Sequence, residues 1–126
     1  MELTKEAIKA KLLLSEELTY NTTAEYETDH YSNYAAMGDE GANLAFIEGV
    51  EDNLEYDEVW GWCCVKQTAE YFGVKGEDYL GACSYRGVID FKDNSGYYED
   101  MKNNALNDLV DQLYTLKRIY SEVPGL

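Results

Sequence analysis

Three cysteines and a single histidine are the residues whose types first point to metal or nucleophile chemistry. Cys63, Cys64 and Cys83 together with His30 match the ligand count of a Cys₃His zinc site. Cys63 and Cys64 are neighbours in a segment predicted to be a strand, where successive side chains point to opposite faces, so both reach one metal only if the strand is broken. A thiol nucleophile paired with His30 also needs a third group to orient the ring, and no residue is indicated for that role. We therefore expect buried, reduced thiols and no metal.

Carboxylate pairs are frequent, as at Asp57 with Glu58 and at Glu99 with Asp100. Because the chain has 25 Asp and Glu, such pairs arise by chance and do not predict acid–base catalysis. Residues 90–99 have the acids and the glycine of a calcium loop, but Lys92 stands where an oxygen ligand is needed. The glycine-rich nucleotide motifs and the G-x-S-x-G motif are absent. We expect neither an enzyme nor a cofactor.

The aromatic residues fall into two groups. Trp60 and Trp62 share a face of the predicted strand and are expected in the core. Tyrosines 20, 26, 31 and 34 lie among polar residues and cannot all be buried. Exposed tyrosines among acids are typical of a protein-binding surface, although ordinary, partly buried tyrosines fit the same pattern.

Helices are predicted at both ends of the chain. Thr4 caps a helix that runs from Lys5 to about Leu14. Residues 93–96 form a turn and cap before a long helix over about 97–120, with acids in its first turn, Lys117 and Arg118 near its last, and an end at Pro124-Gly125. A short helix carrying Leu44, Ile47 and Val50 opens at Asp39-Glu40-Gly41.

Two strands are predicted between these helices, over about 58–72 and 78–86, joined by a five-residue loop at 73–77. Residues 15–34 show no dominant period, and Asn21-Thr22-Thr23 is interpreted as a turn. The apolar stripe of the last helix should lie on the hairpin; its members are Met101, Ala105, Leu109, Leu113 and Leu116. The expected fold is therefore α+β, an antiparallel sheet packed by a C-terminal helix, in one domain over residues 1–126.

Charge is the strongest feature of the composition. Twenty-five Asp and Glu stand against ten Lys and Arg, a formal net charge of −15, about twice the magnitude that solubility asks of a small domain. Self-repulsion of this size destabilises a compact fold, which favours a role for the charge outside the fold. No signal peptide or membrane span is apparent, so we expect a cytoplasmic protein. Acidic surfaces repel nucleic acid and membranes, so a basic protein partner is favoured.

The acids are concentrated in one stretch. Residues 12–65 contain no Lys or Arg, and 13 of these 54 residues are Asp or Glu. Such a density is comparable with that of phosphates in nucleic acid. From this stretch we predict a partner-binding surface made of Glu16, Glu17, Glu25, Tyr26, Glu27, Asp29, Tyr31, Asp39, Glu40, Glu51, Asp52, Glu55, Asp57 and Glu58; Glu48 also belongs to the acidic stretch.

In size, acidity, scarcity of proline and abundance of tyrosine, the chain resembles the small acidic anti-defence proteins of bacteriophages, the anti-CRISPR and anti-restriction inhibitors that imitate DNA. The resemblance is one of composition and transfers no residue roles. It implies an inhibitor that occupies the basic nucleic-acid site of a CRISPR effector or a restriction enzyme as a DNA or RNA mimic, in the cytoplasm of a host bacterium.

Two other classes of function fit the same sequence. The first is an acidic structural or adaptor protein, or a small domain adapted to high salt, with no inhibitory activity. A small enzyme or metal-binding protein whose site no motif reveals is the second.

Overall fold

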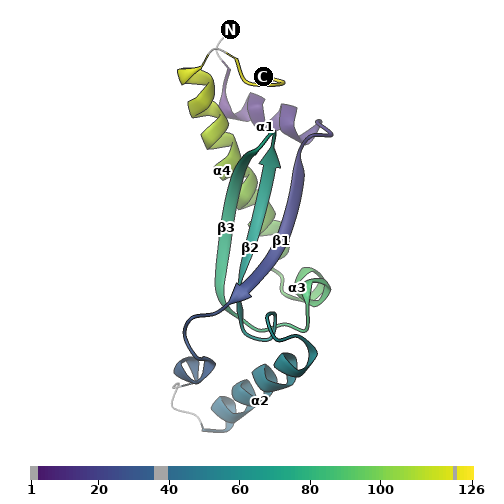
Figure 1. Cartoon of the computed structure of the whole chain (residues 1–126), viewed down its shortest axis with the longest axis vertical. Coiled ribbons are helices and arrows are strands. Elements are labelled where there is room, and N and C mark those ends of the chain that lie inside the picture. The colour runs from purple at the N-terminus through teal and green to yellow at the C-terminus, as the bar shows by residue number, and fades with distance from the viewer. Residues whose placement is uncertain (1–2, 36–39, 121) are drawn as a thin grey trace. The chain divides into compact units, whose positions relative to one another are not determined.

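The computed structural model describes residues 3–35, 40–120 and 122–126. An antiparallel three-stranded sheet with the order β1-β2-β3 is combined with helices (Figure 1), so the predicted α+β class is confirmed. The elements in chain order are α1 (Lys5–Leu13), β1 (Thr19–Tyr26), a 3₁₀ helix η1 (Tyr31–Tyr34), α2 (Glu40–Tyr56), β2 (Cys63–Tyr71), β3 (Val74–Cys83), α3 (Val88–Asn94) and α4 (Tyr98–Ile119).

The chain divides into two compact units. The first unit comprises residues 1–21, 67–78 and 99–126, and the second unit comprises residues 22–66 and 79–98. Each strand contributes residues to both units. One domain over residues 1–126 stays a prediction.

The first unit has its own apolar core. Ile8 and Leu12 of α1 are fully buried with Ala69 and Tyr71 of β2. The Thr4 hydroxyl accepts a hydrogen bond from the Ala7 N–H at 3.1 Å, which caps α1 as predicted. Burial of one side of α1 and its capped start confirm the predicted N-terminal helix.

Helix α4 supplies most of the remaining core of the first unit. Its buried residues include Met101, Ala105, Leu109 and Leu113, whereas Leu116 is only partly buried. Acids in the first turn and Lys117 and Arg118 in the last turn complement the helix dipole, as predicted. Helix α4 confirms the predicted bounds of about 97–120; it ends at Ile119, so Pro124-Gly125 lies beyond its end and does not form it. The Pro124 carbonyl instead accepts a 2.7 Å hydrogen bond from the Tyr71 hydroxyl.

The hairpin of β2 and β3 is tighter than predicted. Phe72 and Gly73 form a two-residue turn, both with positive φ (46° and 83°), which is the geometry of a type I′ turn. A phenylalanine in this conformation is unusual, so the sequence pattern favoured a five-residue loop at 73–77. That loop is wrong, and β3 therefore starts at Val74 and ends at Cys83 instead of covering 78–86.

Gly76 of β3 lies where the strand passes closest to α4. A Cβ at this position would overlap the Ala105 carbonyl oxygen and the Leu109 backbone nitrogen. Backbone atoms of a helix interior cannot retreat, so only glycine permits this approach. Two hydrogen bonds also join β3 to α4. The Glu77 N–H donates to Asp108 at 2.9 Å, and the Gln112 amide donates to the Lys75 carbonyl at 2.7 Å.

Strand β1 corrects the interpretation of Asn21-Thr22-Thr23 as a turn. These residues lie inside β1, whose exposure alternates along the strand. Thr22 and Thr23 are β-branched and suit a pleated, half-exposed strand, which outweighs the turn preference of Asn21. The 3₁₀ helix η1 follows, capped by the His30 side chain, which accepts from the Ser32 N–H.

The start of the predicted strand over 58–72 is also wrong, because residues 58–61 form a turn and β2 begins at Cys63. The Asp57 carboxylate accepts hydrogen bonds of 2.9 Å from the Val59 and Trp60 N–H groups, which closes the turn. Trp60 and Trp62 are buried, with 9% and 7% of their surface exposed, which confirms their place in the core although they lie before the strand.

The helices of the second unit differ in length from prediction. Helix α2 is 17 residues long instead of short, and Asp39, its predicted first residue, lies outside the described residues. The predicted turn at 93–96 begins too early, because Asp93 and Asn94 end the unpredicted helix α3. The turn itself is made by Ser95 and Gly96, which has a φ of 77°.

A matched pair of glycine substitutions tests the packing of α4 on β3. Gly76→Ala should destabilise the protein by about 3 kcal/mol or more, because its methyl group overlaps the backbone of α4. Gly49→Ala, inside exposed α2 with no atom within 4 Å of the new Cβ, should stabilise by about 0.5–1 kcal/mol. Urea unfolding measures both, and equal effects of the two substitutions would contradict the close approach.

Candidate functional site

The most unusual surface of the second unit is the exposed face of α2. Glu48, Glu51, Asp52 and Glu55 follow the spacing i, i+3, i+4, i+7, which places them on one side of the helix, and all four are exposed. We call this set the acidic stripe. Leu44, 59% exposed, precedes it on the same face. The stripe joins three residues of the predicted surface with Glu48, which the predicted surface omitted.

Nothing on α2 balances these charges. The helix contains no Lys or Arg, and among the residues that the structure describes no Lys or Arg nitrogen forms an ion pair with the stripe. Four pairs within the stripe are three or four residues apart, and each such like-charged pair costs a helix about 0.2–0.5 kcal/mol. Acids in the C-terminal half also oppose the helix dipole. The stripe therefore works against the stability of the helix that carries it.

The opposite face of α2 holds the helix in place. Val50 is fully buried, and the Phe46 ring meets the Trp62 indole edge to face at 6.1 Å between centroids. The Asn53 amide donates a 2.9 Å hydrogen bond to the Ser84 hydroxyl. The contacts of Val50, Phe46 and Asn53 orient the stripe towards solvent. On the stripe itself, the Tyr31 hydroxyl donates to Glu51 at 3.2 Å, and partial burial together with this carboxylate raises the pKa of Tyr31, so the phenol stays protonated.

Charge is divided unequally between the units. The second unit contains thirteen Asp and Glu against three Lys and Arg, a formal charge of −10 out of −15. Glu16 and Glu17 are exposed but belong to the first unit. The structure therefore groups most of the predicted acidic surface in the second unit and leaves these two outside that group.

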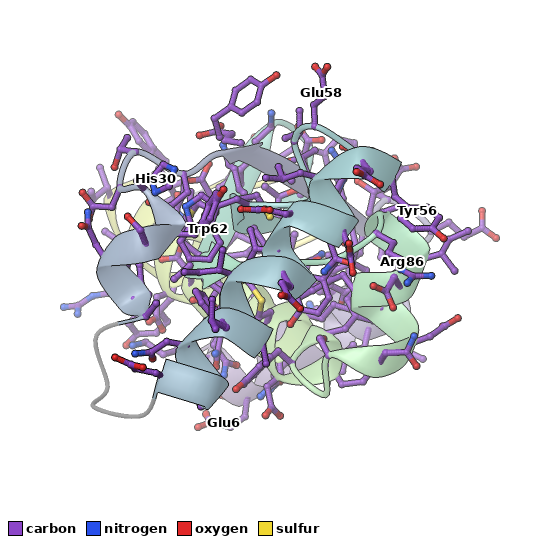
Figure 2. All side chains as sticks on the ribbon, turned by 90° about the horizontal axis from the view of Figure 1, so that it is seen from below. Glu6, His30, Tyr56, Glu58, Trp62 and Arg86 are labelled. Carbon is purple, nitrogen blue, oxygen red and sulfur yellow. The ribbon has the colours of Figure 1, made fainter. Side chains whose placement is uncertain are left out.

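A hollow of about 330 Å³ brings five predicted residues together; they are Tyr26, Glu27, Asp29, Tyr31 and Glu58. Trp62 and His30 complete its aromatic wall, and Figure 2 shows both of them with Glu58. We call this the aromatic hollow. The Trp62 indole N–H donates a 2.6 Å hydrogen bond to the Asp29 carbonyl, and the His30 ring stacks on Tyr31 at 4.1 Å between centroids. Tyr26 is 65% exposed, in accord with the expectation that the tyrosines among acids are not all buried.

Glu27 anchors the wall of the hollow. Its Oε2 atom accepts a 2.7 Å hydrogen bond from the Ala82 N–H, and its Oε1 atom accepts one of 3.0 Å from the Thr28 N–H. The bond from Ala82 is the main cause that lowers the pKa of Glu27 below its ordinary value. Ala82 has a φ of 54°, a strained conformation for a residue with a side chain, and Glu27 helps to hold it there. Glu27 is therefore a structural anion as well as part of the predicted surface.

The remaining predicted residues are placed as follows. Asp57 is half-buried and occupied in the turn before β2. Glu25 at the end of β1 and Glu40 in the first turn of α2 are exposed and line neither the stripe nor the hollow. Asp39 lies outside the described residues.

Two of the three thiols considered for catalysis are poor nucleophiles. Burial raises the pKa of the Cys63 thiol to about 12 and that of Cys83 to about 11, so both stay protonated and poorly nucleophilic at neutral pH. Cys64 is half-buried, consistent with the alternation of faces along β2. The described residues contain no group of three or more His, Cys, Asp or Glu arranged to hold a metal ion.

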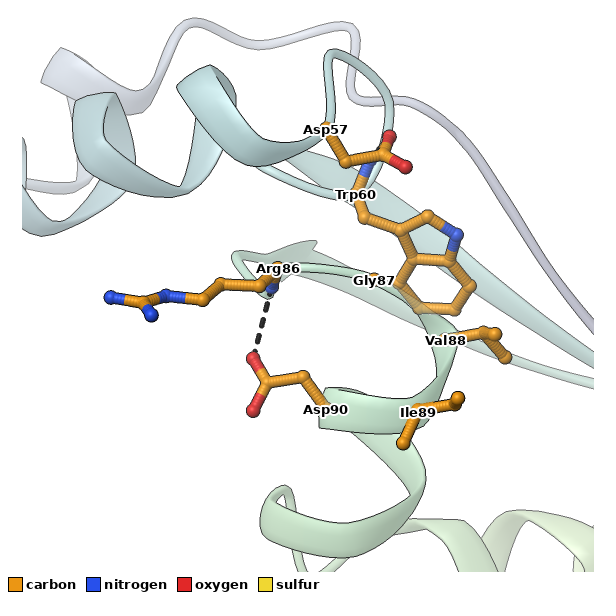
Figure 3. A pocket seen from close by; sticks show the side chains of 7 residues that line it. All are labelled: Asp57, Trp60, Arg86, Gly87, Val88, Ile89 and Asp90. Carbon is orange, nitrogen blue, oxygen red and sulfur yellow. Dashed lines mark hydrogen bonds between the residues drawn. The ribbon is translucent and has the colours of Figure 1, made fainter.

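A second hollow lies beside α3 and is lined by Asp57, Trp60, Arg86 and residues 87–90. The Asp90 carboxylate accepts a hydrogen bond from the Arg86 N–H at 2.9 Å (Figure 3). It accepts a second one from the Asn94 amide at 2.8 Å. Both of its oxygens thus accept hydrogen bonds from within the protein, one from the Arg86 backbone and one from the Asn94 side chain, unlike those of a calcium loop. The Arg86 guanidinium points away from Trp60 in Figure 3 and lies over the Tyr56 ring at 4.2 Å.

In the part of the chain that the structure describes, every helix is too short or too polar to cross a lipid bilayer. No protein-family model matches the chain, and no curated protein or solved structure matches it either. The candidate site therefore stands on its own geometry and charge.

Sequence reasoning missed Glu48 of the stripe and the hollow residues Thr28, His30, Leu54 and Trp62. Glu48 was in the acidic stretch, and the i, i+4 spacing with Asp52 was the signal that could have placed it in the stripe. His30 was considered only as a metal ligand or as the partner of a thiol nucleophile, and Trp62 only as a core residue. The alternation of acids and aromatics over Glu25 to Tyr31 was a signal for His30, whereas only the turn before β2 brings Trp62 to the hollow.

Glu27→Gln tests the anchor. The glutamine oxygen can still accept the Ala82 N–H, but the loss of charge should destabilise the protein by roughly 1 kcal/mol at neutral pH. A lowered pKa in the folded protein stabilises it above the ordinary pKa of glutamate, and this stabilisation is lost as the pH falls through the folded value. The difference from the parent protein should therefore shrink as the pH falls through the lowered pKa of Glu27 and vanish below it.

Glu25→Gln is the matched control, since it removes the same charge two residues earlier from an exposed side chain. Urea unfolding between pH 3 and pH 7 measures both variants. A pH-independent effect of Glu27→Gln, or an equal effect of Glu25→Gln, would show that the anchor does not act through its charge.

Proposed function

We propose that the chain inhibits a nucleic-acid-targeting defence system, as an anti-CRISPR or anti-restriction protein that occupies the basic nucleic-acid site of its target. The acidic stripe on α2 is the observation that carries this proposal. The stripe is exposed, forms no ion pair among the described residues and lowers the stability of its own helix. These properties are expected when a charge is maintained for a partner.

The spacing of the stripe supports a mimic of nucleic acid. Four carboxylates spread over seven residue steps give one charge per ~3.5 Å of helix axis, close to the ~3.4 Å spacing of phosphates along one DNA strand. A cleft lined with Arg and Lys for a phosphate backbone would meet a similar row of charge on α2. The inhibitor would act stoichiometrically, in the cytoplasm of a host bacterium, and bind neither nucleic acid nor membrane directly.

DNA cleavage by a panel of purified CRISPR effectors and restriction enzymes, each titrated with the protein, tests the proposal. We expect stoichiometric inhibition of at least one nuclease, competitive with its nucleic acid and relieved by salt. Glu48→Gln/Glu55→Gln should weaken inhibition about tenfold, as expected for two charge pairs of about 0.7 kcal/mol each.

Glu16→Gln/Glu17→Gln is the matched control for this experiment. It removes the same charge from two exposed glutamates of the first unit and should leave inhibition within about twofold of the parent protein. Inhibition that is insensitive to salt and noncompetitive, or no inhibition across the panel, would contradict the mimic.

The stability of the stripe variant separates this function from that of an acidic adaptor or a salt-adapted domain. Glu48→Gln/Glu55→Gln removes all four like-charged pairs, so it should stabilise the protein by about 1 kcal/mol at low salt. Screening should erase most of this gain in about 1 M NaCl. Urea unfolding measures the effect; a parent protein that folds only at molar salt would instead favour salt adaptation.

A further inference from the structure

The aromatic hollow differs from the acidic stripe because it is concave and walled by rings. Its volume of about 330 Å³ is at the lower end of the ~300–1,000 Å³ range of ligand pockets. A space of this size accommodates one side chain better than a length of peptide. Tyr26, Tyr31 and Trp62 provide the apolar part of the wall.

The charged residues that line the hollow determine whether a bound group should be an anion, a cation or neutral. Glu27, Asp29 and Glu58 line the hollow, and no Lys or Arg does so among the described residues. Glu58 is exposed and has no ion pair or hydrogen bond within the described part of the chain. An anion or a neutral polar group would gain little here, whereas a cation would be attracted by the acidic side chains that line the hollow.

The rings distinguish between the two common cationic side chains. A guanidinium group is planar, stacks on aromatic faces and donates hydrogen bonds in a fork that matches carboxylates. An ammonium group is compact and strongly hydrated, so it uses an aromatic wall less well. Tyr26, 65% exposed at the rim, and the carboxylates of Asp29 and Glu58 therefore favour arginine over lysine.

The hollow is also fixed in shape before any partner binds. The Trp62 indole is held by the Asp29 carbonyl at 2.6 Å and by ring contacts with Tyr34 at 5.3 Å and Phe46 at 6.1 Å between centroids. Glu27 is tied to the Ala82 N–H. Preorganisation of this kind reduces the entropy that binding would cost.

We propose that the aromatic hollow receives one arginine side chain that projects from the basic cleft of the protein partner. This proposal rests on the function proposed above and names the residue type that the second unit would capture. The stripe supplies diffuse attraction along the cleft, and the hollow supplies one specific contact. Arginine is also the cation most often placed to read phosphates and bases in such clefts.

The test measures the binding of three short peptides to the isolated protein. The first is acetyl-Gly-Arg-Gly-amide. The second has citrulline, which has the size of arginine without its charge, in place of arginine, and the third has lysine there. Binding is followed by NMR on the indole N–H signals. Trp62 lines the hollow and should shift and saturate, whereas Trp60, which does not line it, serves as the internal control.

We expect the arginine peptide to bind at least about tenfold more tightly than the citrulline peptide and several-fold more tightly than the lysine peptide. Glu58→Gln and Asp29→Asn should each weaken it about fivefold. Glu48→Gln removes one charge from the stripe, outside the hollow, and should change it less than about twofold. Free L-arginine should bind more weakly than the peptide, because its own carboxylate is repelled; tighter binding would contradict docking of a protein side chain.

Equal binding of the arginine and citrulline peptides, equal effects of Glu58→Gln and Glu48→Gln, or a shift at Trp60 in place of Trp62 would overturn the proposal. The outcome separates the two proposals. Nuclease inhibition that is lost in Glu48→Gln/Glu55→Gln but kept in Asp29→Asn/Glu58→Gln would retain the inhibitor and remove the arginine site. Arginine-selective binding at Trp62 without inhibition of any nuclease would retain the site and remove the inhibitor.

Discussion

Repulsion among the carboxylates of α2 is the constraint on which the second unit depends. Glu48, Glu51, Asp52 and Glu55 share one exposed face without a compensating cation among the described residues. The helix must therefore be held by its other face, through Val50, the Phe46 contact with Trp62, and the hydrogen bond from Asn53 to Ser84. Neutral contacts on one side thus support charge on the other.

The same tryptophan links the stripe to the hollow. Trp62 packs against α2 on one side and forms part of the wall of the hollow on the other, and its N–H fixes the backbone at Asp29. Asp57 makes this placement possible, because its carboxylate closes the turn that carries the indole into the core. Some acids are therefore structural, as Asp57 and Glu27 are, and others are directed to solvent, as the stripe and Glu58 are.

Local signals predicted the parts of the fold that they control. The Thr4 cap and the charge pattern of α4 act within a few residues, and both helices formed where expected. The strand at Asn21 to Thr23 depends on its pairing with β2, which a local pattern does not contain. The left-handed Phe72 and the turn at 58–61 that Asp57 closes are local, but a left-handed phenylalanine is unusual and the apolar run over 59–65 favoured a strand. Acidity predicted the candidate surface in outline, but only the structure separates Glu16 and Glu17 from the acids of the second unit.

Hydrogen exchange of the protein, alone and with a nuclease whose cleavage it reduces in the proposed titration, tests most directly whether the acidic stripe and the aromatic hollow form the proposed binding surface. Bound nuclease should slow amide exchange in residues 26–31 and in α2, and addition of the cognate nucleic acid should reverse this protection as the inhibitor is displaced. Protection confined to α1 and α4, or protection that persists when nucleic acid binds, would contradict the account.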